Sequence, residues 1–151
     1  MKLKCLTILI LIAFTSICFA KADDAVDLWQ TYDLKGNARS VIKFYIVNSE
    51  LRADIIKLND GYEKLCSKCK GNLKNQPFVG MTIIQGLQFK NNKWINGKVL
   101  DGDSGKNYNC QISISKDGSL MKFHVFKGHP VFGRTVQWHR MSKIKLSGGT
   151  I

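Results

Sequence analysis

The sequence predicts an all-β fold, a single domain in which short antiparallel strands follow one another in a meander. From residue 40 onward apolar residues recur with a period of two, and turn-forming residues separate the apolar runs. No segment shows the 3.6-residue period of a long helix. The chain of 151 residues, 44% hydrophobic and 23% charged, is long enough to bury one core. Such strands form either a barrel or a sandwich.

About eight short strands account for this pattern. In residues 106–115, Cys110 and Ile112 alternate with polar neighbours, which is the pattern of a half-buried strand. Asp117 and Gly118 then supply the positive φ angles of a hairpin turn. The expected strands cover residues 28–32, 41–47, 51–58, 79–89, 93–100, 106–115, 120–126 and 131–141. A short helix is expected before them, around residues 23–28.

Residues 1–20 have the pattern of a secretory signal peptide. Lys2 and Lys4 precede an apolar run, and Cys18 and Ala20 place small side chains at positions −3 and −1 of a cleavage site. The alternative is an uncleaved anchor, but the apolar run is shorter than the ~20 residues that a spanning helix needs. We therefore expect cleavage after residue 20 and a periplasmic or secreted protein.

Removal of this segment leaves one domain and a short tail. Residues 21–146 form the expected β domain, and the glycine-containing residues 147–151 are expected to be flexible. The formal charge falls from +12 to +10, because the removed segment contains two lysines and no acidic residue.

The remaining positive charge is spread along the chain. Four lysines fall within expected strands beside apolar neighbours: Lys43, Lys57, Lys98 and Lys122. We expect them on the outer face of the sheet, where they also discourage pairing with other chains. A second interpretation is attraction to an anionic membrane surface. A nucleic-acid partner is not expected, because the basic residues are not interleaved with a base-stacking motif.

Three cysteines remain after cleavage. Cys66 and Cys69 form a Cys-x-x-Cys spacing in a lysine-rich polar loop, and we expect a small disulfide that closes this loop. A redox-active thiol pair and a metal site are the alternatives, since nearby lysines favour the thiolate. Cys110 shares a face with apolar residues, so we expect it in the core as a small hydrophobic side chain.

No catalytic arrangement of residues is recognisable. The serines lack the sequence context of an activated nucleophile, and no pair of carboxylates suits acid–base chemistry. The histidines have no ligand spacing with each other or with acidic residues: His124, His129 and His139. We therefore expect neither an enzyme, nor a cofactor, nor a bound metal.

An ordered set of motifs resembles a known family, the bacterial exported family called domain of unknown function 2147. The similarity covers nearly all of residues 25–142. The sequence departs from the family pattern at Asp27, Ala53 and Asp103, where glycine, glycine and proline are common. The motifs are Leu28-Trp29, Cys66-x-x-Cys69-Lys70-Gly71, Gln76-Pro77-Phe78-Val79-Gly80, Trp94-Ile95-Asn96-Gly97-Lys98-Val99, Asp103-Ser104-Gly105-Lys106-Asn107-Tyr108, Phe132-Gly133-Arg134-Thr135 and Trp138-His139-Arg140.

The resemblance implies a single antiparallel up-and-down barrel of the lipocalin-like type, with about eight strands and no established activity. In such a barrel a tryptophan on the first strand and an arginine on the last would close one end. Trp29 and Arg140 suit this role through a cation–π contact.

Arg134 is the residue of greatest interest for a ligand. Arg134 is an even number of residues from Phe132 and Trp138, so the three side chains share one face of the expected strand. If that face points into the barrel, the guanidinium lies among apolar side chains. Such a charge needs a partner, either an internal group such as the Tyr108 hydroxyl or the carboxylate of a bound molecule. We therefore take Phe132, Arg134, Tyr108 and Trp138 as candidate ligand-binding residues.

Three functions remain open from the sequence. The first is the binding of a small apolar or amphipathic ligand inside the barrel. The second is interaction with the envelope or a membrane surface through a filled barrel with a basic exterior. The third is thiol or metal chemistry at Cys66 and Cys69.

Overall fold

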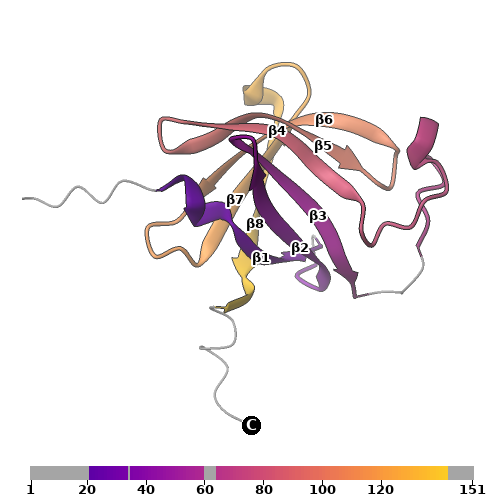
Figure 1. Cartoon of the computed structure of the whole chain (residues 1–151), viewed down its shortest axis with the longest axis horizontal. Helices are drawn as coiled ribbons and strands as arrows, with labels where there is room; N and C mark the ends of the chain where they lie inside the picture. The colour runs from indigo at the N-terminus through magenta and orange to yellow at the C-terminus, as the bar shows by residue number, and fades with distance from the viewer. Residues whose placement is uncertain (1–20, 34, 60–63, 143–151) are drawn as a thin grey trace, which may run out of the picture.

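Eight strands form one closed barrel in the order of the sequence (Figure 1). The computed structural model describes residues 21–142 except residue 34 and residues 60–63, so the predicted signal peptide and tail lie outside the described residues. Each strand is antiparallel to the next, and β1 pairs with β8 to close the barrel. The prediction of an all-β, up-and-down barrel is therefore confirmed.

The strands agree with the expected segments over most of their length. Three short 3₁₀ helices accompany them: η1 (Ala22–Ala25), η2 (Gly71–Leu73) and η3 (Pro130–Phe132). The strands are β1 (Asp27–Tyr32), β2 (Ala38–Val47), β3 (Glu50–Leu58), β4 (Thr82–Lys90), β5 (Lys93–Asp101), β6 (Lys106–Ile114), β7 (Leu120–Phe126) and β8 (Arg134–Arg140).

Several boundaries differ from the expectation, and three of them have a local cause. The last strand begins at Arg134 rather than at residue 131, because Pro130 starts η3 and proline fits the first turn of a helix. The fourth strand begins at Thr82 rather than at residue 79, because a turn with Gly80 at a φ of 89° precedes it. The helix expected over residues 23–28 is η1 alone, since β1 already begins at Asp27.

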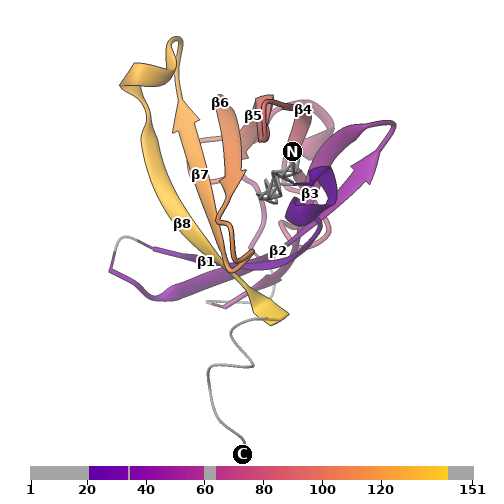
Figure 2. The same cartoon turned by 90° about the vertical axis from the view of Figure 1, so that its left-hand side faces the viewer.

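Successive connections alternate between the two ends of the barrel, as an up-and-down topology requires. The β2–β3, β4–β5 and β6–β7 turns lie at the same end as η1, which we call the closed end (Figures 1 and 2). The other four connections lie at the opposite end, which we call the open end. The loops at the open end are therefore the ones that surround any cavity entered from that side.

Apolar side chains fill the middle and the closed end of the barrel. Burial of each large apolar side chain contributes roughly 1.5–3 kcal/mol. The largest fully buried side chains on the strands are Trp29, Phe44, Leu51, Ile84, Leu87, Cys110, Ile112 and Met121. Cys110 thus occupies the core position that its strand parity predicted, whereas Lys43, Lys57, Lys98 and Lys122 are exposed on the outer face.

Arg140 ties several elements together at the closed end. Its guanidinium lies over the ring of Trp29, 4.4 Å from the ring centroid, as the family resemblance implied. Nη1 donates to the Asp27 carboxylate at 2.8 Å, and Nε donates to the Gly118 carbonyl at 2.5 Å. Nη2 donates to the carbonyl of Asp24. One side chain on β8 therefore holds β1, the β6–β7 turn and the segment that contains η1.

The acidic partner of this arginine titrates below its ordinary range. Burial raises the pKa of Asp27, but the hydrogen bonds from Arg140, the Leu28 N–H and Ser142, with the charge of Arg140, outweigh burial and lower that pKa overall. The ion pair is therefore present at neutral pH and is lost as the pH falls through the range in which carboxylates protonate.

We predict that Arg140→Ala lowers the free energy of unfolding by about 2–4 kcal/mol at neutral pH, because it strips a part-buried Asp27 of its partner. Urea unfolding measures this change. Asp27 is more acidic in the folded protein, so the difference between the two proteins should shrink below about pH 4. Arg52→Ala, which removes an arginine from the more exposed pair with Glu50, should cost less than about 1 kcal/mol. Equal losses in the two variants would contradict this role for Arg140.

Candidate functional site

A cavity of about 700 Å³ opens at the open end of the barrel. None of the eight largest fully buried side chains on the strands lines it, so the barrel is packed in one half and hollow in the other. Its inner wall is mainly apolar and aromatic: Ile42, Ile55, Ile83, Val99, Tyr108, Phe123, Val125, Val136 and Trp138. A wall of this kind suits a small molecule with an apolar body.

Trp138 and Phe123 provide an aromatic part of this wall. Their rings stack with centroids 4.3 Å apart, and Phe44 lies 6.1 Å from Trp138 on the packed side. Trp138 is 7% exposed and Phe123 is 3% exposed, so the core holds both rings firmly. The cavity therefore has a rigid wall where it meets the packed half.

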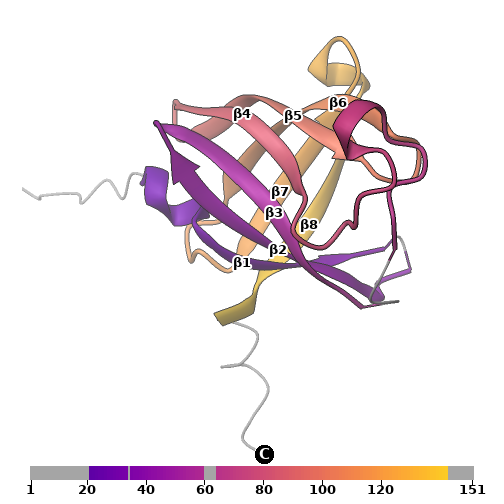
Figure 3. The same ribbon diagram turned by 45° about the vertical axis from the view of Figure 1, so that its right-hand side comes forward.

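The β3–β4 connection contributes to the mouth of the cavity. Within residues 64–81, a disulfide joins Cys66 and Cys69, with an S–S distance of 1.91 Å. The segment packs against the β5–β6 turn at the open end (Figure 3). A Cβ at Gly105 would lie 1.9 Å from the Lys68 carbonyl oxygen, and a Cβ at Gly102 would lie 2.4 Å from the Phe78 ring. Glycine at these two positions thus permits the close approach that brings Phe78 to the cavity.

The cysteines lie apart from the cavity wall. Cys66 and Cys69 are 0% and 3% exposed, so the protein shields both sulfurs from external thiols. Burial raises the pKa of the Cys110 thiol to about 12, which keeps it protonated. Among the residues that the structure describes, no group of three or more histidine, cysteine, aspartate or glutamate side chains could hold a metal ion.

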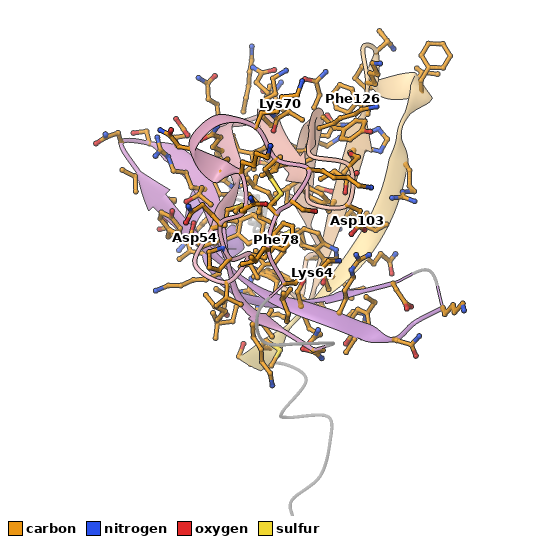
Figure 4. All side chains as sticks on the ribbon, turned by 90° about the vertical axis from the view of Figure 1, so that its right-hand side faces the viewer. Asp54, Lys64, Lys70, Phe78, Asp103 and Phe126 are labelled. Atoms are coloured by element: carbon orange, nitrogen blue, oxygen red, sulfur yellow. A yellow bond between two sulfur atoms is a disulfide. The ribbon has the colours of Figure 1, made fainter. Side chains whose placement is uncertain are left out.

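Charged side chains surround the mouth. Asp103 on the β5–β6 turn accepts hydrogen bonds from Arg39 at 2.7 Å and from Lys64 at 3.0 Å (Figure 4). These two hydrogen bonds hold the pKa of Asp103 below its ordinary value, so the carboxylate stays ionised. Lys64 also lies over the Phe78 ring, 5.9 Å from its centroid. Lys127 and Arg134 complete the cationic groups that line the mouth.

The structure brings the four predicted ligand-binding residues to this cavity, but not at equal depth. Tyr108 and Trp138 belong to the inner wall. Arg134 lies on the inward face of its strand, the condition under which the sequence placed it among apolar side chains, yet it is exposed at the mouth. Phe132 lies on η3 at the rim and is 81% exposed, so its predicted place on an inward strand face is wrong.

The comparisons with known proteins agree with this architecture. The chain is similar in structure to protein HP1028 from the human pathogen Helicobacter pylori, which belongs to the lipocalin family. The TM-score is 0.70, with 20% sequence identity over 81% of this chain and 86% of HP1028. At this identity the similarity establishes the fold, a lipocalin-like barrel.

The sequence itself identifies the family. The family model described as "Uncharacterized protein conserved in bacteria (DUF2147)" matches residues 27–140, well over half of the chain. The chain belongs to the DUF2147 family. The family resemblance that the motifs indicated is therefore confirmed. A search of the curated proteins finds no match to this DUF2147 sequence, and no helix in its described part is long and apolar enough to cross a membrane.

Sequence reasoning missed several residues at the mouth of this DUF2147 barrel. Arg39, Lys64, Phe78 and Lys127 all line the cavity, and none was expected there. The sequence does contain a pattern that could have placed Lys127. Lys127 follows Phe123 and Val125 at the next alternate position, so it lies on the same inward strand face. Phe78 reaches the cavity through tertiary packing of a long connection, which strand periodicity does not report.

We predict that the cysteines of the folded protein separate into two classes in an iodoacetamide experiment at neutral pH. Cys110 should be modified only after unfolding, because burial shields it and its raised pKa suppresses the thiolate. Cys66 and Cys69 should be modified only after reduction, since a disulfide joins them. Peptide mass spectrometry reads each cysteine separately, with unfolded, reduced protein as the control. Modification of Cys66 or Cys69 without a reductant would contradict the disulfide.

Proposed function

We propose that this DUF2147 protein is a binding protein, not an enzyme, and that it holds a small apolar or amphipathic molecule in the barrel cavity. The observation that carries the proposal is the cavity itself, about 700 Å³ with an apolar and aromatic inner wall. Pockets for small molecules are commonly about 300–1,000 Å³ and are lined in this way, with a few polar groups for orientation. The Tyr108 side chain is one such polar group on the inner wall.

The proposed place of action is the periplasm or the exterior of the cell. The support is the signal-peptide pattern of residues 1–20, together with the disulfide between Cys66 and Cys69. Disulfides persist in oxidising compartments, whereas the cytosol keeps most thiols reduced. An exported carrier for a poorly soluble molecule would need a shielded apolar cavity of this kind.

We predict that the protein binds the neutral fluorescent probe N-phenyl-1-naphthylamine and that Val125→Trp weakens this binding by about tenfold or more. Val125 lines the cavity, so the larger side chain occupies the space that the probe needs. Fluorescence titration measures the affinity.

Val47→Trp is the matched control, because Val47 is 38% exposed at the closed end and outside the cavity. It should bind the probe as the unmodified protein does. Circular dichroism checks that both variants fold. Absence of probe binding by the unmodified protein, or unchanged binding by folded Val125→Trp, would refute the proposed cavity function.

A second candidate function is contact with an anionic membrane surface, and the β7–β8 connection favours it. This hairpin stands out beyond the neighbouring strands (Figure 2), and its tip carries Val131 and Phe132, which are 77% and 81% exposed. Lys127 and Arg134 flank the tip and are exposed as well. Apolar side chains beside cationic ones match the interface of an anionic bilayer.

We predict that the protein sediments with phosphatidylglycerol vesicles more than with phosphatidylcholine vesicles, and that added salt weakens the association. Phe132→Ser should reduce it by about tenfold, the expected effect of losing one inserted aromatic side chain. Phe89→Ser, at the closed end, is the control that should leave it unchanged, because Phe89 is 36% exposed far from the tip. Equal association with both lipids, or no effect of Phe132→Ser, would count against membrane contact through this tip.

A further inference from the structure

We propose that the molecule held in the barrel is an amphipathic anion, whose carboxylate or phosphate head Lys127 and Arg134 receive while its apolar body lies in the cavity. This inference rests on the proposed ligand-binding function and narrows it to one chemical class. Its basis is the pairing of charges around the mouth, where some cations already have an acidic partner and two do not.

Lys127 and Arg134 continue the inward rows of the last two strands. On β7 the inward residues are Phe123 and Val125, and Lys127 follows at the next position of the same parity. On β8 Arg134 precedes Val136 in the same way, and it lies directly opposite Val125 in the register. Both cationic side chains therefore border the apolar wall at its outer limit, where the head of a molecule inserted from the open end would lie.

The other two cations of the mouth already share an acidic partner. Asp103 accepts hydrogen bonds from both Arg39 and Lys64, so these three side chains form one ion-pair network. Asp101, the second acidic group at the cavity, accepts from the Ser104 hydroxyl at 2.6 Å and from the N–H of Asp103 at 3.1 Å. The Asp101 carboxylate is therefore held within the β5–β6 turn, and the Asp103 carboxylate is held by Arg39 and Lys64.

Among the described residues, neither Lys127 nor Arg134 has an ion pair or a hydrogen bond to another side chain. Both are exposed, so water hydrates them when the cavity holds no ligand. An anionic head would replace that water with charge-assisted hydrogen bonds, and the arginine fork offers two parallel donors to a carboxylate or phosphate. A cationic head would meet repulsion at the same place, so the mouth selects the sign of the head.

The test compares three molecules with the same apolar chain and different heads: dodecanoate, dodecanol and dodecyltrimethylammonium. Each displaces N-phenyl-1-naphthylamine from the full-length protein and from the double variant K127Q/R134Q. We expect the double variant to lose about tenfold or more in affinity for dodecanoate and to change by less than about twofold for dodecanol. Its affinity for the cationic molecule should rise, because a repulsive pair of charges is gone. Dodecyl phosphate should behave as dodecanoate does.

The matched control is K43Q/K122Q, which removes the same charge from the outer faces of β2 and β7, where both lysines are exposed. It should change the three affinities by less than about twofold. Acetate and inorganic phosphate carry the head without the chain and should not displace the probe; displacement by either would overturn a site that needs both parts.

The outcomes separate this inference from the proposed function. If none of the dodecyl compounds binds the unmodified protein, the cavity function itself fails. If all three bind and K127Q/R134Q affects them equally, the cavity function stands and the assignment of the head group fails. Selective loss of the anionic compounds in K127Q/R134Q, and not in K43Q/K122Q, would establish the anion site.

Discussion

The closure of the barrel depends on one part-buried guanidinium. Strands β1 and β8 pair through Trp29 with Arg140 and Gln30 with His139, a much shorter junction than the six residue pairs between β7 and β8. Arg140 compensates for this short pairing with contacts that backbone pairing does not provide, a tryptophan face, a carboxylate and two carbonyls. Because β8 begins at the cavity and ends at Arg140, anchoring its end at the closed side also fixes the strand that carries Trp138 and Arg134.

The division of the barrel into a packed and a hollow half follows from the same arrangement. A hollow interior lacks the dispersion contacts of a packed core, so its walls need support from elsewhere. The fully buried side chains of the closed half provide this support, and the stacked rings of Phe123 and Trp138 stand at the boundary. Stability concentrated in one half leaves the loops of the other half available for binding, which is the usual division between scaffold and site.

Strand periodicity predicted the fold well because parity alone decides whether a side chain on a barrel strand points inward or outward. Parity assigned Cys110 to the core and grouped Arg134 with Trp138 on one strand face. It does not report depth along the barrel axis: an inward face predicted Arg134 among apolar side chains, whereas Arg134 lies exposed at the mouth. The alternation also continues through Val131 and Phe132, where Pro130 starts a 3₁₀ helix instead of a strand. Side chains delivered by long connections, such as Phe78, depend on tertiary contacts that no local pattern contains.

The position of the acidic residues, rather than the number of basic ones, determines the character of the mouth. The chain carries 23 lysines and arginines against 11 aspartates and glutamates, so the acidic residues are too few to pair with every cation one to one. Exposed cations on the outer faces of the strands are hydrated and screened by salt, so they do not discriminate between ligands. At the mouth, Asp103 pairs with both Arg39 and Lys64 and offsets part of their charge, and the β7–β8 side keeps all of its positive charge next to an apolar wall. One carboxylate on the β5–β6 turn therefore gives the entrance two chemically different sides, and this asymmetry would orient any amphipathic molecule that enters.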